Sequence, residues 1–546
     1  MSQDKLFVIA IGGTGMRCLE AFTHLCAMGM FDDQEIEVLT LDTDQSNGNK
    51  KKVEQLIELY SRIKSSDGKS NANSDTFFSA KLNLHKYWTN YEGAGRENYR
   101  NLSRLSSGTP EEQEENKLLS DLFLEKATVQ EFNLAHGYRA QTHLGSQLMY
   151  HGIVEAARSL ASGKDVKIEE QELEKYLGKL QAAGADARVF IFGSVFGGTG
   201  ASSIPVIPKA FQDFIKIRSG GKSTLDLTKV KFGATLLTEY FSFKKPDMKQ
   251  MSTKKDSVVA DSSFFPLNSQ AALQFYQNDP TVKTTYKRLY HIGWPIESKP
   301  IGGDKQDDKT ITGGANQKNP CHITEMMCAC AGYDFLTRKD GFDLATAEYV
   351  FKAIEFDKSA FNFDFNDFVG YENKTGDMFA NRLGAFLSFA HIALSINKAA
   401  FSTNEKGVKG FINRMNQMKL TDYNSLSEED TIDMDNYLKE FAYTFDGQDF
   451  IPGWIYQVRS TVSPGKFMFD DKAFTFIKKE LEKIDVGALF LDSNHHWEKS
   501  ILSNSYDTFV KKLIDQGKPK QEQKVTTTKE RFLAHIYNAI TLSQKF

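Results

Sequence analysis

A run of apolar residues that ends at a glycine-rich turn is the feature that most constrains the fold of this chain. Residues 5–11 have the sequence KLFVIAI, and Gly12-Gly13-Thr14-Gly15 follow directly. A continuous apolar run of this length indicates a strand buried on both faces, as in parallel sheets covered by helices. Residues 16–28 carry apolar side chains at helical spacing, and residues 35–42 (EIEVLTLD) predict a second strand. This part of the chain is therefore predicted to be a strand–loop–helix–strand unit of an α/β fold.

The same pattern returns in the middle of the chain. Residues 188–194 (RVFIFGS) form another apolar run, which leads into Gly197-Gly198-Thr199-Gly200. Strands that alternate with helices predict a doubly wound parallel sheet. The further elements predicted here are helices at 141–162, 168–183 and 268–278 and strands at 231–238 and 288–293.

Two parts of the chain depart from this alternation. Residues 45–135 are polar and rich in Asn, Ser, Lys and Glu, which predicts an inserted set of short helices and loops over the edge of the sheet that carries the glycines. Asn319-Pro320 predict a helix start, since Asn is a good N-cap and Pro suits the first helical position. The predicted organisation is a first domain at 1–318, a buried core helix at 319–340, a mostly helical or α+β domain at 341–515, and a linker with a terminal amphipathic helix at 516–546.

Composition excludes several classes of partner. The formal net charge of −4 gives no basic field that would attract nucleic acid or an anionic membrane. No apolar stretch approaches the roughly 20 residues that a membrane-spanning helix needs. Residues 1–5 (MSQDK) lack the features of a secretory signal, so we expect a cytoplasmic protein.

The cysteines indicate neither a disulfide framework nor a metal centre. Five cysteines in 546 residues are too few for a disulfide-stapled fold. Cys321, His322, Cys328 and Cys330 are metal-capable, but they lack paired C-x-x-C spacing. We therefore predict that they are small residues of a buried core, and no metal site.

The two glycine loops, residues 12–15 and 197–200, predict a shared phosphate site. Glycine lets the backbone approach an anion closely, and the helix that follows adds the positive end of its dipole. Each loop follows a predicted buried strand, so both would lie at the carboxyl edge of one sheet. Either loop alone is also compatible with a tight strand-to-helix turn that binds nothing.

Two familiar nucleotide motifs fit less well. In the dinucleotide pattern G-x-G-x-x-G, Gly13 and Gly15 match and Asp42 could hold a ribose, but Cys18 takes the place of the third glycine. An NAD-dependent oxidoreductase is therefore a weaker alternative. Neither loop carries the G-K-[ST] of a P-loop.

The motifs resemble those of the tubulin/FtsZ superfamily. Residues 192–206 (FGSVFGGTGASSIPV) resemble its signature G-G-G-T-G-[ST]-G, with Phe196 in place of the first glycine. Residues 9–15 resemble its first phosphate loop, and residues 41–44 (LDTD) resemble the N-T-D that closes its second strand. Segments at 137–146 and 268–273 are similar to the divergent bacterial tubulin-like family in particular. The resemblance covers about residues 5–340.

The resemblance implies a protein that binds GTP or GDP together with Mg²⁺. Both glycine loops would hold phosphates, Asp44 would lie near them, and the loop before Gly145 would approach the terminal phosphate. Asn268 would contact the guanine, because an amide can pair with the donor and acceptor edge of the base. For Asn268, a helix N-cap is an equal alternative.

The resemblance further implies a GTPase completed at a subunit interface, by an acid from the region that follows the sixth strand. Glu325 is the best match to that acid, and His322 lies on the same predicted helix face. A carboxylate there could orient or partly deprotonate water while Mg²⁺ and backbone donors carry the phosphate charge. The alternative is a helix start whose dipole attracts an acid with no catalytic role.

Assembly follows from such an interface. A head-to-tail contact makes filaments when it does not close on itself. The resemblance therefore implies self-association into filaments or oligomers, as a cytoskeletal-like or defence-related switch, with the C-terminal region available to protein partners. The alternative is a non-polymerising sensor or scaffold, in which residues 45–135 block the contact between subunits.

Overall fold

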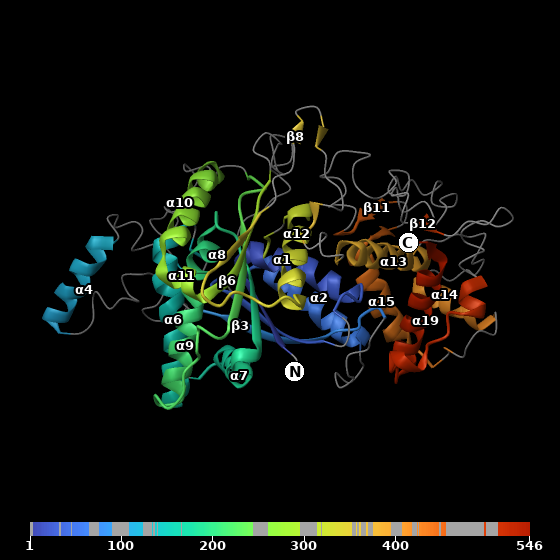
Figure 1. Cartoon of the computed structure of the whole chain (residues 1–546), viewed down its shortest axis with the longest axis horizontal. Coiled ribbons are helices and arrows are strands. Elements are labelled where there is room, and N and C mark those ends of the chain that lie inside the picture. Colours follow the sequence, from blue (N-terminus) through green and yellow to red (C-terminus); the bar gives the residue numbers. More distant parts are fainter. Residues whose placement is uncertain are drawn as a thin grey trace.

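A computed structural model shows an α/β protein built around one parallel sheet (Figure 1). Parts of three predicted features lie outside the residues that it describes: the polar stretch 45–135, the loop before Asn319, and the region 341–515. The described residues are 4–31, 34–44, 46–64, 76–89, 109–123, 134, 137–138, 140–164, 166–243, 260–294, 314–317, 319–351, 356–357, 360–361, 367–369, 375–394, 407–417, 423, 425–446, 449–454, 496–497 and 511–545.

The central sheet has seven strands, and every neighbouring pair is parallel. This confirms the predicted parallel sheet. The apolar run of residues 5–11 is apolar throughout because its two faces enter two different cores, with Leu6 and Val8 on one side and Phe7 and Ile9 on the other. The order across the sheet is β3 (Lys81–Trp88), β2 (Glu35–Asp42), β1 (Lys5–Ile11), β4 (Ala187–Phe192), β5 (Lys231–Leu237), β6 (Tyr286–Ile292) and β7 (Glu348–Val350).

Helices cover both faces of this sheet (Figure 1). One face carries α1 (Gly12–Ala27), α2 (Gly48–Lys64) and α12 (Ile323–Thr337). The other face carries α6 (Thr142–Ser162), α7 (Ile168–Ala183), α8 (Gly198–Ser203), α9 (Ile207–Arg218), α10 (Phe265–Asn278) and α11 (Pro280–Thr285). The helices predicted at 141–162, 168–183 and 268–278 are thus confirmed, the last one beginning three residues earlier.

The prediction that residues 45–135 are only short helices and loops is wrong for two of its segments. Residues 48–64 form α2, which packs on the sheet, and residues 81–88 form the edge strand β3. Both are polar because each has a solvent-facing side: α2 buries one stripe that includes Val53 and Tyr60, and β3 has a neighbour on one side only. A further helix, α4 (Pro110–Phe123), lies at one end of the molecule in Figure 1.

The core helix begins later than predicted. The structure places the start of α12 at Ile323, with His322 as its N-cap, instead of at Asn319-Pro320. Glu325 completes a capping box, since its carboxylate accepts a hydrogen bond from the backbone N–H of His322. The prediction that this helix is buried is confirmed, because nearly all of its residues lie in the core.

The C-terminal helices share one hydrophobic core with α1, α2 and α12. His24 of α1, for example, lies against the rings of Tyr437, Phe441 and Trp454. No helix among the described residues is long and apolar enough to cross a membrane. The elements of this region are the helices α13 (Thr375–Leu394), α14 (Gly407–Gln417), α15 (Glu428–Phe441) and α19 (Thr528–Ser543), and the strand pairs β8 (Phe356–Asp357) with β9 (Ala360–Phe361), β10 (Tyr443–Asp446) with β11 (Asp449–Pro452), and β12 (His496–Trp497) with β13 (Gln544–Lys545).

Candidate functional site

The two glycine loops meet where the strand order of the sheet reverses. The first loop (residues 12–15) follows β1, and the second loop (residues 197–200) follows the neighbouring strand β4. From β1 the sheet continues to β2 and β3 in one direction, and from β4 to β5 and β6 in the other. In doubly wound sheets, ligands bind outside the carboxyl ends of the strands at this point. The loops therefore lie where the fold favours a ligand.

The loops touch each other through a glycine in a left-handed conformation. Gly12 has a φ of +66°, and a β-carbon on it would lie 3.1 Å from the β-carbon of Thr199. Gly15 allows a different close approach, because a β-carbon there would lie 2.5 Å from the carbonyl oxygen of Phe192 in β4. Glycine is thus required at both positions by the backbone geometry of the site.

Both helices that follow the loops begin without a side-chain cap. Neither the N-cap of α1, Ile11, nor that of α8, Gly197, makes a side-chain capping hydrogen bond. The first N–H groups of a helix have no partner within the helix, and the helix dipole places positive charge there. Both helix starts lie at the same edge of the sheet, where backbone N–H groups can bind an anion.

Residues 42–44 border this edge from the end of β2. The Asp42 carboxylate accepts hydrogen bonds from the backbone N–H of Thr43 at 2.7 Å and from the side chain of Asn47 at 2.7 Å. Asp44 accepts a hydrogen bond from the backbone N–H of Gly314 at 2.8 Å. Both acids therefore organise the surrounding loops, and Asp42, which is 1% exposed, has its oxygens occupied.

A buried hydroxyl near the loops has no hydrogen-bond partner in the part of the chain that the structure describes. Thr43 is 1% exposed, and its Oγ1 makes no hydrogen bond among the described residues. A β-carbon on Gly137 would lie 3.8 Å from this oxygen and 4.0 Å from Oγ1 of Thr199. Buried polar groups normally have partners, so this hydroxyl is available to a ligand.

Because Asp42 is buried, its carboxyl group titrates near neutral pH. Burial, together with the neighbouring charge of Asp44, raises the pKa of Asp42 from 3.8 to about 7. Between these two values the folded chain holds a proton that the unfolded chain has released, so stability falls as the pH rises.

We therefore expect the free energy of unfolding of the wild type, relative to Asp42→Asn, to decrease between pH 4 and pH 7. The slope should reach at most about 1.4 kcal/mol per pH unit. Urea unfolding of both proteins across this range measures it. A difference that does not change with pH would contradict the assigned titration.

Asn268 contacts the residue that precedes the second glycine loop. Its side-chain amide donates a hydrogen bond to the carbonyl oxygen of Phe196 at 3.3 Å. It is the fourth residue of α10, so the alternative interpretation as an N-cap is wrong. The Phe196 ring itself packs against Phe241 and Phe265, with centroid distances of 5.5 and 4.7 Å. The phenylalanine that replaces the first glycine of the signature therefore points into the core, and its ring does not fill the space at the loop.

Gly145 lies beside the same loop and serves packing. A β-carbon on Gly145 would lie 2.4 Å from the ring of Tyr138 and 2.6 Å from the hydroxyl oxygen of Ser202. Ser146 also donates a hydrogen bond to the carbonyl oxygen of Ser202 at 2.8 Å. The start of α6 is thereby held against α8. The approach of the loop before Gly145 to a terminal phosphate stays a prediction.

Glu325 and His322 are both fully buried, which differs from the expected exposed interface position. The Tyr240 hydroxyl donates a hydrogen bond to Glu325 at 2.7 Å, and burial raises the pKa of Glu325. His322 accepts a hydrogen bond from the backbone N–H of Thr324 at 3.2 Å and packs against the Trp294 ring, and burial lowers its pKa to about 3. An acid that reaches a second subunit must be exposed. In this structure Glu325 caps α12, as the alternative interpretation predicted.

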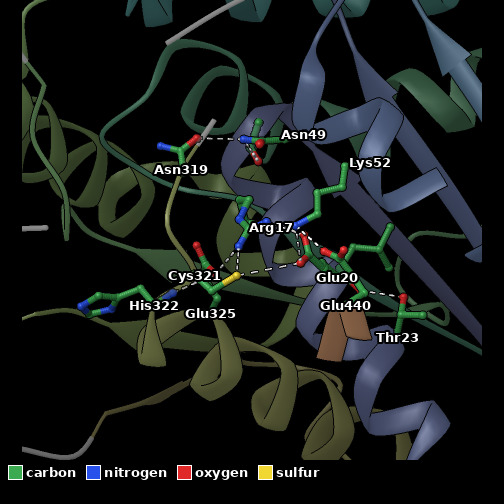
Figure 2. Close-up of polar contacts among 12 residues, drawn as sticks. Arg17, Glu20, Thr23, Asn49, Lys52, Asn319, Cys321, His322, Glu325 and Glu440 are labelled. Atoms are coloured by element: carbon green, nitrogen blue, oxygen red, sulfur yellow. Dashed lines mark hydrogen bonds and ion pairs between the residues drawn. The ribbon is translucent and has the colours of Figure 1, made fainter. Parts of the chain in front are cut away.

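Glu325 belongs to a charge cluster that extends from the core to the surface near the first glycine loop (Figure 2). Arg17 is its centre: the guanidinium pairs with Glu20, contacts the thiol of Cys321, and lies 3.4 Å from the carboxylate of Glu325. Lys52 extends the cluster, with its ammonium 3.2 Å from Glu20. Its remaining member is Glu440 of α15, which lies 2.6 Å from the Lys52 ammonium.

This group of six residues, called the Arg17 cluster below, joins α1, α2, the start of α12 and α15. Sequence reasoning did not identify it. The only signal is the pair Arg17 and Glu20, three residues apart on an otherwise apolar helix. The cluster ties the first glycine loop to the C-terminal region.

The described residues contain no group of three or more His, Cys, Asp or Glu that could hold a metal ion. A Mg²⁺ ion at the glycine loops would therefore depend on phosphate oxygens and water, which is its usual mode of binding with nucleotides. Cys328 and Cys330 are buried in the core, as predicted. A scan against protein-family models found no match to this chain, and neither did a search of curated proteins.

Proposed function

We propose that this chain is a tubulin/FtsZ-like nucleotide-binding protein that holds the phosphates of GTP or GDP between its two glycine loops. The observation that carries the proposal is the contact between the two glycine loops, at Gly12 and Thr199, where the strand order reverses between β1 and β4. Such a site suits an anion that carries several charges. A nucleoside diphosphate or triphosphate is such an anion.

The residues present fit a nucleotide phosphate with its Mg²⁺. The backbone of both loops can donate to phosphate oxygens, and Thr199 of the second loop lies beside Gly12 of the first. The hydroxyl of Thr43, which has no partner among the described residues, can bind a phosphate oxygen or a water molecule of the metal ion. When bound, Mg²⁺ would neutralise phosphate charge.

The contacts at the end of β2 disfavour the NAD alternative. A dinucleotide site uses the acid at the end of the second strand to hold the ribose hydroxyls. Asp42 is that acid here, and its oxygens already accept hydrogen bonds from Thr43, Asp44 and Asn47. The carboxylate that would hold a ribose is therefore already used in hydrogen bonds within its own loop.

Assembly and hydrolysis follow from the resemblance, and we propose head-to-tail self-association into filaments as the activity of the nucleotide-bound chain. One observation favours the alternative of a non-polymerising sensor or scaffold. The best match to a catalytic acid, Glu325, is buried and paired with Arg17 and Tyr240. In that case the chain would bind nucleotide without completing a GTPase in a neighbour.

Sedimentation with GTP or GDP in Mg²⁺ separates these two functions. We expect more protein in the pellet with GTP than with GDP, accompanied by release of phosphate. A chain that binds GTP but neither sediments nor releases phosphate would refute assembly and support the sensor or scaffold. Electron microscopy of the pellet distinguishes filaments from amorphous aggregate.

A further inference from the structure

The side chain of Gln317 lies against the first glycine loop. Its Nε2 is 2.5 Å from the position that a β-carbon on Gly13 would occupy. Its backbone carbonyl oxygen is 2.6 Å from the corresponding position on Gly48, the first residue of α2. Glycine at both positions therefore makes room for Gln317 between the starts of α1 and α2.

The segment that carries Gln317 is held in place on both sides. The backbone N–H of Gly314 donates to Asp44 at 2.8 Å, and the N–H of Gly48 donates to the Gly314 carbonyl at 3.1 Å. After Gln317, the side chain of Asn319 accepts a hydrogen bond from Asn49 at 3.0 Å (Figure 2). Because both ends are tied down, ordering Gln317 at a ligand costs little further entropy.

The carboxamide of Gln317 has an unused acceptor. Its Oε1 is buried and makes no hydrogen bond to any described residue. A buried polar atom without a partner is costly, and a ligand would remove that cost. The nearby helix start of α1 is where the proposed function places a phosphate, and an amide can donate to phosphate oxygen and accept from water on Mg²⁺.

We infer that Gln317 is a third phosphate-binding element, in addition to the two glycine loops. Its Nε2 donates to a phosphate oxygen at the first loop, and its Oε1 accepts from water that hydrates the metal ion. Gly13 is then required because it seats this side chain. The inference rests on the proposed nucleotide-binding function.

Titration with a fluorescent GTP analogue in Mg²⁺ tests this assignment. Gln317→Glu should weaken binding by about tenfold or more, because a carboxylate repels phosphate and cannot donate to it. Gln317→Ala should weaken binding by about three- to tenfold, as expected for one lost hydrogen bond to a charged group. The matched control is Gln171→Glu, an exposed glutamine of α7 on the other face of the sheet, which should bind as the wild type does.

A double-mutant cycle tests whether Gly13→Ala weakens binding by displacing Gln317 or by blocking the nucleotide directly. Gly13→Ala places a methyl group onto the Gln317 carboxamide and should weaken binding, whereas Gly13→Ala combined with Gln317→Ala should bind no worse than Gln317→Ala alone. Additive losses, or tighter binding by Gln317→Ala, would overturn the inference. If the wild type binds no nucleotide, the proposed function fails instead.

Discussion

Replacing Arg17 with methionine is expected to lower the free energy of unfolding by about 3–5 kcal/mol, the usual cost of removing one partner from a buried ion pair. Arg17 is 2% exposed, and its loss leaves the carboxylate of Glu20 in the core with Lys52 as its one counter-charge among the described residues. Glu325 also loses its guanidinium partner. Methionine keeps an unbranched apolar stem, so the loss of the guanidinium group is the main change.

A surface pair of the same type provides the control. Arg158 and Glu155 of α6 are also three residues apart and lie 2.5 Å from each other, but the arginine is 61% exposed. Arg158→Met should cost less than about 1 kcal/mol, as exposed pairs do. Urea unfolding measures both changes, with one dependence of the free energy of unfolding on urea concentration fitted to all proteins. Equal losses for the two substitutions would show that the Arg17 cluster does not stabilise the fold.

The second large effect is expected on ligand binding. Gly12→Ala should weaken GTP binding by about tenfold or more, because an alanine in the left-handed region carries about 1–2 kcal/mol of strain. Its β-carbon would also lie 3.1 Å from the β-carbon of Thr199. The loop can relieve both problems only by shifting, which moves its N–H groups away from the phosphate.

Gly163→Ala is the matched control for this substitution. Gly163 ends α6 with a φ of +68°, almost the same as Gly12, but a β-carbon there would meet nothing within 4 Å. Both variants should lose stability through the left-handed strain, and only Gly12→Ala should lose affinity for GTP in the same titration. Equal affinities for the two variants would show that the first glycine loop is not a phosphate site.

The sheet could be predicted from the sequence because its inner strands are apolar on both faces. Residues 5–11 and 35–42 match the strands β1 and β2, and the glycine loops were correctly assigned to one edge. The edge strand β3 was missed because most of its residues are only partly buried, so its sequence, KLNLHKYW, contains enough polar residues to resemble a loop. The apolar sequence pattern is therefore strongest in the strands whose residues are most deeply buried.

The polar contacts of the site could not be predicted in the same way. Arg17 and Glu325 are 308 positions apart, and Gly13 and Gln317 are similarly distant, so only the tertiary fold brings the members of each pair together. Glu325 was correctly placed at the start of a helix, but an acid in a first turn is compatible with a cap and with catalysis alike. Burial separates these roles, and burial is a property of the fold.

Mass spectrometry under native conditions tests the central claim most directly. The purified chain would be offered GTP, ATP and NAD at equal concentrations with Mg²⁺, and the mass of the complex identifies the bound ligand. The proposal predicts one guanine nucleotide per chain, with the complex lost in Gly12→Ala and kept in Gly163→Ala. A complex with NAD, or no nucleotide complex, would contradict a tubulin/FtsZ-like phosphate site between the two glycine loops.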